Sequence, residues 1–257
     1  MDFALNEIQQ ELKQQAREWL ASRYPLDRDW DAPQDDRWAE LGELGWLDVA
    51  EAELGFVEEA LLVEELGYAL YPGPYLAHVT GQDDVFGSGG EIETIDPTRP
   101  LKRLPNGSSE SPRLRAAIAA EAVGVAQRAL ELGIEHARTR MQFGKPIGQY
   151  QAVSHQLADT YTDVELARSL AYWAAWCVAQ HDEQAPVAAA AAKAFATEAA
   201  VAACERSIQV HGGIGFTWEH PLHRYYKRAL WLEGFGTRPA QLRLEVADAV
   251  LRAGVTV

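Results

Sequence analysis

Two motifs about seventy positions apart carry side chains suited to binding a phosphorylated ligand. The first, Arg140–Gly148, reads Arg-Met-Gln-Phe-Gly-Lys-Pro-Ile-Gly, and the second, Gln209–Phe216, reads Gln-Val-His-Gly-Gly-Ile-Gly-Phe. The planar guanidinium of an arginine suits the pyrophosphate of a dinucleotide, and glycines let a backbone approach a ligand closely. Each motif also has a simpler interpretation, because cations stabilise helix C-termini and glycines commonly cap helices. The second motif is not a dinucleotide-binding GxGxxG loop, because a helical pattern and not a strand precedes it.

Both motifs stand where a long helical pattern breaks. Segment 114–140 has no proline and is rich in Ala, Leu, Glu and Arg, so it predicts a helix. Pro146 and Gly148 interrupt the pattern. It resumes over 150–180, 186–210, 221–232 and 239–252. Long helices with short connections predict an antiparallel bundle.

The chain divides into three segments by composition. Residues 1–80 show helical periodicity, with helix ends expected at Gly45 and Gly67. Residues 81–113 are rich in Gly, Pro, Ser and Asp and read as a linker, with one short strand or hairpin possible around 91–95. A domain needs roughly 50 residues to hold its own core, so no β domain fits there. The prediction is an all-α protein, with an N-terminal helical domain and a C-terminal bundle over 114–257.

The bulk composition narrows the function. The net charge of −15 over 257 residues argues against nucleic-acid binding, which needs clustered Lys and Arg. Cys177 and Cys204 lie in apolar helical stretches and predict buried thiols, with neither a disulfide nor a metal site. The start shows no signal-peptide pattern. The Ala-rich run 187–192 is too short to span a bilayer. We expect a cytoplasmic protein without a membrane segment.

In combination, the motifs resemble the acyl-CoA dehydrogenase family. The similarity over 112–253 includes Ala-Val-Gly-Val-Ala-Gln-Arg-Ala-Leu at 122–130, both motifs, and Thr-Trp-Glu-His-Pro at 217–221, in the family's order and spacing. It is looser over 1–80, through 38–47 and Glu-Glu-Leu-Gly at 64–67. Asp-Pro-Thr-Arg-Pro at 96–100 is similar to the segment that closes the family's middle β domain.

The resemblance implies an FAD site shared between subunits, because the family's C-terminal domain clamps the FAD of a neighbouring subunit. It implies three groups of clamp residues: Arg140, Gln142 and Phe143 at the pyrophosphate and adenosine, Ile147, Tyr150 and Gln151 beside them, and Gln209, Gly212 and Gly213 at the ADP portion. By the same resemblance, Arg115 supports substrate binding and Thr237 touches the flavin of its own subunit.

The catalytic base departs from the family pattern. In the family a carboxylate takes the α-proton of an acyl-CoA while hydride leaves Cβ for flavin N5, so the base must reach its proton. The residue that usually carries it precedes a Gly-Thr pair and here is Phe235, and the alternative position is Leu114. Glu233 and Glu121 lie near these positions and could replace the base. The alternative for both is a solvated or structurally paired carboxylate.

The chain thus departs from the family in two ways: it lacks the base, and the middle β domain is reduced to residues 81–113. A larger partner subunit that supplies both the base and the β domain explains the two departures. Some bacterial members of the family are heterotetramers of two unlike subunits, with one base between them. We therefore predict the base-lacking subunit of an α2β2 enzyme that binds FAD and an acyl-CoA, with an electron-transfer flavoprotein as one candidate electron acceptor. A shortened middle segment suits a bulky substrate, such as a steroid side chain or a polyketide-type thioester. A non-catalytic scaffold protein and a self-sufficient dehydrogenase using Glu233 are the alternatives.

Overall fold

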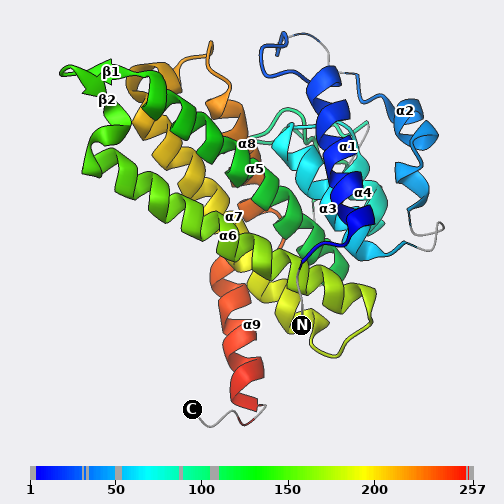
Figure 1. Cartoon of the computed structure of the whole chain (residues 1–257). Coiled ribbons are helices and arrows are strands. Elements are labelled where there is room, and N and C mark those ends of the chain that lie inside the picture. The colour runs from blue at the N-terminus through cyan, green and yellow to red at the C-terminus, as the bar shows by residue number, and fades with distance from the viewer. Residues whose placement is uncertain are drawn as a thin grey trace.

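The computed structural model describes residues 4–30, 32, 35–49, 54–86, 89–104, 110–252 and 254. Within these ranges the chain is helical apart from one small hairpin (Figure 1). The N-terminal part contains α1 (Glu7–Arg23), α2 (Trp38–Glu43), η1 (Trp46–Asp48), α3 (Phe56–Tyr68) and α4 (Tyr75–Thr80). The C-terminal part contains α5 (Pro112–Thr139), β1 (Met141–Gln142), β2 (Lys145–Pro146), η2 (Ile147–Gln149), α6 (Gln151–Ala179), α7 (Ala185–His211), η3 (Gly212–Phe216), α8 (Leu222–Gly234) and α9 (Pro239–Arg252).

Three long helices, α5, α6 and α7, form the frame of the molecule (Figure 1). The 28 residues of α5 extend over about 42 Å at 1.5 Å per residue. Alanines line the contacts between the long helices, and Ala126, Ala129 and Ala196 are fully buried. Because alanine side chains are short, the helix backbones can approach closely. The all-α prediction is confirmed.

Glycines set the crossing of α3 over α5. A Cβ added to Gly124 would lie 1.9 Å from the carbonyl oxygen of Glu64, and one added to Gly67 would lie 2.4 Å from that of Glu121. Only glycine allows such an approach of two backbones. We expected Gly67 to end a helix. The helix does end close by, at Tyr68, but Gly67 lies inside α3. Gly45, with φ 72°, does follow the end of α2.

The middle segment is anchored to the helices by a buried ion network. Arg228 of α8 donates to Asp96 and to Glu121 of α5, and its Nη2 lies 2.6 Å from the Thr98 hydroxyl. Arg99 donates to the same Glu121 carboxylate at 2.7 Å. No strand forms around 91–95 in the described part of the segment, which has only isolated bridges from Leu101 to 86 and 92. Its residues 87–88 and 105–109 lie outside the described ranges, and the three-part domain division stays a prediction.

The predicted helix positions agree closely with the structure in the C-terminal half. The segment expected over 239–252 is α9, and those expected over 114–140 and 150–180 are α5 and α6. The stretch Ala185–Phe216 around α7 is long and apolar enough to cross a membrane, but 67% of its most apolar window is buried inside the fold. A helix that is apolar all round is typical of a core position, so this stretch reads as the central helix of the bundle.

Candidate functional site

The first motif folds as a tight hairpin at the C-terminal end of α5. Strand β1 pairs antiparallel with β2, in the register Met141 with Pro146 and Gln142 with Lys145. The two residues of the turn, Phe143 and Gly144, both have positive φ, 50° and 81°. Two-residue hairpin loops of this kind need positive φ at both positions, which glycine adopts freely and phenylalanine rarely does. The sequence pattern indicates only a helix break here, so the hairpin was not predicted.

The tip of this hairpin projects into solvent. Phe143 is 93% exposed although it is a large apolar side chain. Its ring is 6.5 Å from that of Tyr150, whose hydroxyl donates to the carbonyl of Gln142 at 3.2 Å. The ammonium of Lys145 lies 4.1 Å from the Tyr150 ring centroid. Tyr150 therefore contacts the hairpin on one side, while Phe143 at the tip stays accessible to solvent.

Stacked histidines bring the second motif to the same end of the bundle. The ring of His136, in the last turn of α5, lies 4.3 Å from that of His211, the last residue of α7. His220 lies 4.4 Å from His211 on the other side. Arg140 is one turn beyond His136, and Gln209 is two residues before His211. The two motifs, far apart in sequence, are therefore neighbours in space.

The glycine turn of the second motif is open. Gly212 has φ 64°, and a Cβ built on Gly212 or on Gly213 would meet no other atom within 4 Å. Gln209 is exposed on the last turns of α7, and Arg140 is exposed at the C-cap of α5. Gln142 and Gln151 are also exposed, and Ile147 packs partly against the core. A guanidinium and several exposed amides thus lie at the same end of the bundle as this accessible backbone.

The histidines beneath these motifs are held neutral. Burial, followed by the nearby His211, His136 and His223, lowers the pKa of His220 to about 4. Burial also lowers the pKa of His136, with contributions from His211 and Arg140. Two protonated rings in one stack would repel each other. At neutral pH the positive charge of this end therefore resides on its arginines and lysine.

The two positions where a base is expected lie at the opposite end of α5. Leu114, in its first turn, is 2% exposed, and Phe235, just after α8, is 5% exposed. The Phe235 ring lies 5.1 Å from Phe86 and 4.7 Å from Trp231. These three aromatic side chains, hereafter the aromatic plug, pack together where the resemblance places a carboxylate.

A buried lysine fixes the chain around this plug. The Lys193 ammonium donates to the carbonyl of Phe235 at 2.6 Å and forms an ion pair with Glu110, just before α5. Glu110 also pairs with Arg115 at 3.3 Å. Thr237 follows one residue after Gly236 and is buried. Lys193 therefore ties together the elements that carry Arg115 and Thr237. In the sequence, Lys193 directly follows the Ala-rich run 187–192, and neither it nor Glu110 belongs to one of the two motifs.

Neither candidate carboxylate reaches the plug. Glu121 is buried and accepts from Arg99 and Arg228, so it is the structurally paired carboxylate of the two alternatives. Glu233 is half-buried, and its pKa is raised by burial and by Glu198. It lies two residues from Trp231, which is about 200° around a helix at 3.6 residues per turn. Glu233 therefore faces away from the plug.

The predicted site residues thus fall into two groups. Arg140, Gln209 and their neighbours gather at the C-terminal end of α5, and Arg115 and Thr237 at its N-terminal end, which gives a separation of about 40 Å. Arg115 is also engaged by Glu245 of α9 at 2.6 Å. No pocket of the usual size for a small molecule spans such a distance. Within one chain, the two groups cannot serve the same flavin.

Two features define the class of this protein: an all-α bundle built on three long helices, and an exposed arginine and a glycine turn at the same end of it. A family model described as the acyl-CoA dehydrogenase C-terminal domain matches residues 112–250, and one described as the N-terminal domain matches residues 6–83. The chain belongs to the acyl-CoA dehydrogenase family. The stretch between the two matches, 84–111, lies within the middle segment, 81–113.

Relatives and solved structures agree with this assignment. The chain is 41% identical over 150 residues to acyl-CoA dehydrogenase IpdE2 of Mycobacterium tuberculosis, covering 55% of this chain and 45% of that protein, so it spans under half of that relative. The fold is similar to butyryl-CoA dehydrogenase from Megasphaera elsdenii, with a TM-score of 0.79, 19% identity, and coverage of 98% and 100% of the two chains. It is also similar to the ChsE4–ChsE5 complex from Mycobacterium tuberculosis, with a TM-score of 0.76, 21% identity and coverage of 98% and 99%.

The family is FAD-dependent, and the clamp residues fit such a cofactor. Arg140 offers the fork of donors that suits a pyrophosphate, and the amides of Gln142 and Gln209 can donate or accept. The open space over Gly212 and Gly213 admits a ligand close to the backbone.

Proposed function

We propose that this chain is the base-lacking, FAD-clamping subunit of a heteromeric acyl-CoA dehydrogenase. The enzyme would perform α,β-dehydrogenation of an acyl-CoA thioester, with the catalytic carboxylate on a larger partner subunit. The observation that carries the proposal is a separation of about 40 Å along α5. At one end lie the clamp residues around Arg140 and Gln209. At the other end lie Leu114 and Phe235, hereafter the former base position, where the resemblance places a carboxylate. Because the clamp lies so far from the N-terminal end of α5 in its own chain, it would bind a flavin whose ring is held by another chain.

The aromatic plug supports the absence of a base from this chain. A base must lie within hydrogen-bond reach of the proton it takes, but Leu114 and Phe235 are apolar and buried. Phe86, from the middle segment, closes the plug and is 0% exposed. The space that a substrate's reacting carbons would need is filled by side chains.

Exposed apolar side chains near the clamp support a partner. Phe143 is 93% exposed, Phe216 76% and Trp218 72%, and all three belong to the clamp motifs or follow them directly. Clustered exposed aromatics of this size are typical of interaction surfaces. The hairpin holds Phe143 in a left-handed backbone conformation that costs about 1–2 kcal/mol. The turn therefore keeps the Phe143 ring exposed although its backbone conformation is unfavourable for phenylalanine. A partner subunit that covers the clamp end would bury these rings.

The chain's own residues would bind and orient the cofactor. FAD, when bound, supplies the hydride acceptor. The Arg140 guanidinium would hold its pyrophosphate oxygens, and the Gln209 amide would donate to the ADP portion. The clamp-end histidines remain neutral, so the positive charge there resides on Arg140, Arg138 and Lys145. The α-proton of the substrate would go to the partner's carboxylate.

The test compares Arg140→Ala with Arg138→Ala, a matched loss of one exposed arginine two residues away, in the complex purified from the native host. Native mass spectrometry gives the partner and the stoichiometry, and flavin absorbance gives the FAD content. We expect Arg140→Ala to weaken FAD retention roughly tenfold or more, the usual cost of a charged hydrogen bond, and Arg138→Ala to retain it. Equal retention in the two variants would favour the scaffold alternative.

The self-sufficient alternative has its own test. If the purified chain alone binds stoichiometric FAD and oxidises an acyl-CoA, the proposal is wrong. Glu233→Gln in the complex should leave turnover unchanged, because Glu233 faces away from the plug. Loss of turnover in that variant with FAD content unchanged would assign the base to Glu233.

A further inference from the structure

Three histidine rings meet at the clamp end, and they are hereafter called the histidine stack: His136 of α5, His211 of α7 and His220 just before α8. The ring centroids of His136 and His211 are 4.3 Å apart, with 29° between the ring planes. Those of His211 and His220 are 4.4 Å apart. Rings at such distances are in direct contact. The stack therefore joins the ends of α5 and α7 to the start of α8.

Two of these histidines are attached directly to the clamp motifs. The backbone N–H of Arg140 donates to the carbonyl of His136 at 2.9 Å, so both residues belong to the same turn at the end of α5. Gly212 follows His211 in the chain. A Cβ added to Gly215 would lie 3.1 Å from the Cβ of His211, so the glycine turn packs closely on this residue. A displacement of either ring would therefore move the arginine or the open glycine backbone with it.

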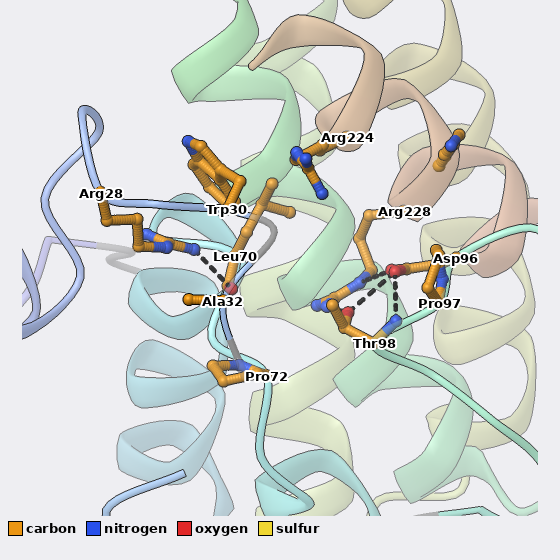
Figure 2. A pocket seen from close by; sticks show the side chains of 11 residues that line it. Arg28, Trp30, Ala32, Leu70, Pro72, Asp96, Pro97, Thr98, Arg224 and Arg228 are labelled. Carbon is orange, nitrogen blue, oxygen red and sulfur yellow. Dashed lines mark hydrogen bonds and ion pairs between the residues drawn. The ribbon is translucent and has the colours of Figure 1, made fainter. Parts of the chain in front are cut away.

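The third histidine is carried by an anchored helix. The Nδ1 atom of His220 accepts the backbone N–H of Leu222, the first residue of α8, at 3.3 Å. Further along α8, Arg228 pairs with Asp96 and donates to the Thr98 hydroxyl (Figure 2). Because this ion network is buried, α8 has a fixed position, and so has the ring at its start.

The hydrogen bonds of the stack fix where its protons lie. The Nδ1 atom of His211 is 2.8 Å from the carbonyl of Ser207, which can only accept, so this nitrogen carries a proton. The Nδ1 atom of His220 accepts a backbone N–H and therefore carries none. A protonated His220 ring would lose this bond. His220 is therefore neutral in this arrangement.

The groups around the stack also favour neutral rings. Burial lowers the pKa of His211, although its backbone hydrogen bond raises it. After burial, His211 and Arg140 lower the pKa of His136. The pKa of His220 is lowered by burial, by the other two rings and by His223. A charge on His220 would also stand at the N-terminus of α8, where the helix dipole disfavours cations.

We propose that the histidine stack positions the clamp for FAD: its neutral rings hold Arg140 and the Gly212–Gly213 turn at the spacing that the cofactor requires. This inference rests on the proposed function, because it assigns a role within the same FAD site. The alternative role for histidines near a pyrophosphate is direct contact as cations. The His211 ring is buried and its Nδ1 is engaged by a carbonyl, which is unsuited to that role.

The test measures the dissociation constant of FAD by equilibrium dialysis of the complex purified from the native host. His136→Phe keeps an aromatic ring and should bind FAD as tightly as the unchanged chain. His136→Ala removes the ring and should weaken FAD binding roughly three- to tenfold, the usual contribution of an aromatic pair. His181→Asn is the matched control and should leave FAD binding unchanged. This exposed histidine stands just after α6 with φ 49°, a conformation that asparagine adopts readily.

A double-variant cycle separates positioning from a general structural role. If the His136 ring acts by placing Arg140, His136→Ala should cost less FAD affinity in an Arg140→Ala background than alone, whereas independent contributions multiply. The pH profile gives a second readout. FAD binding should be equal at about pH 8 and about pH 6.5, because the stack stays neutral over a range in which an ordinary histidine gains charge.

The outcomes distinguish this inference from the proposed function. Unchanged FAD binding in His136→Ala and His220→Ala, while Arg140→Ala loses FAD, would overturn this inference and leave the proposed function standing. Equal losses in His136→Phe and His136→Ala would also overturn it, because the ring would then not hold the clamp. Tighter binding at the lower pH that disappears in His136→Phe would assign a cationic contact instead.

Two further cases complete the test. If Arg140→Ala retains FAD, the proposed function fails and this inference fails with it. If His136→Ala does not assemble, His220→Ala supplies the same measurement, because it removes the partly exposed ring on the other contact of His211.

Discussion

Replacing Glu121 by glutamine is expected to lower the free energy of unfolding by about 3–5 kcal/mol. The Glu121 side chain is buried at the meeting point of α5, α8 and the middle segment. Burial alone would raise its pKa, but Arg99 and Arg228 outweigh that effect and hold the pKa below its ordinary value. Asp96 is likewise held ionised, chiefly by Arg228 against its burial.

The magnitude follows from the charge balance of this network. Arg99 and Arg228 balance Asp96 and Glu121, so the buried cluster is neutral overall. Glutamine keeps the shape and the oxygen that accepts from both arginines. The substitution removes the charge and replaces the unpaired Oε2 by an NH2 group. One buried arginine then lacks a counter-ion, which costs about 3–5 kcal/mol. For a chain of this size that amounts to a fall in Tm of roughly 6–20 °C.

The assay is urea unfolding followed by circular dichroism, with calorimetry for Tm. Glu245→Gln is the control, because it removes a carboxylate from a partly exposed ion pair with Arg115 and should cost under about 1 kcal/mol. The double variant Arg99→Met with Glu121→Gln restores neutrality and should lose less than the sum of the single losses. A Glu121→Gln loss below about 1 kcal/mol, or strict additivity in the double variant, would refute the charge-balance reasoning.

Three further outcomes are expected. Gly124→Ala should destabilise the fold by about 3 kcal/mol or more, because its Cβ would collide with the Glu64 carbonyl, whereas Gly213→Ala should leave urea unfolding unchanged and weaken FAD retention. Phe143→Asn should stabilise the hairpin by up to about 1 kcal/mol, because Asn-Gly suits a turn with two positive φ angles, while reducing assembly with the partner measured by native mass spectrometry. His220, whose pKa falls from 6.5 unfolded to about 4 folded, should favour the folded state above pH 6.5 and lose that contribution as pH falls toward 4. His220→Gln should therefore show a smaller drop in unfolding free energy from pH 7 to 5, by about 1 kcal/mol after solvent screening; an unchanged drop would exclude the histidine stack as its source.

The helices were predictable because their signals are local. Segment 239–252 was expected as a helix and is α9, and α5 begins two residues before its expected start. Helix propensity, proline and glycine act within about one turn of the chain. The hairpin after α5 was missed because strands of two residues carry no periodic signal, and only Phe143-Gly144 marks the turn.

The motif residues of the candidate site were predictable from the sequence, but the tertiary contacts around them were not. Resemblance pointed to Arg140 and Gln209, and the histidine stack places their helix ends side by side. Nothing in the sequence indicated that Lys193 binds the carbonyl of Phe235, 42 positions away. Nor did the sequence indicate that His136 and His220 both pack against the His211 ring.

By itself, the sequence determined the all-α class, the family and the two motifs, because these depend on near neighbours and on residue identity. Only the tertiary structure decided that Asp96 and Arg99, in a segment with the composition of a linker, belong to a buried network, since their partners Glu121 and Arg228 lie on other helices. It also decided that the clamp and the former base position stand at opposite ends of α5. Such facts depend on how distant helices cross, and local patterns carry no record of that crossing.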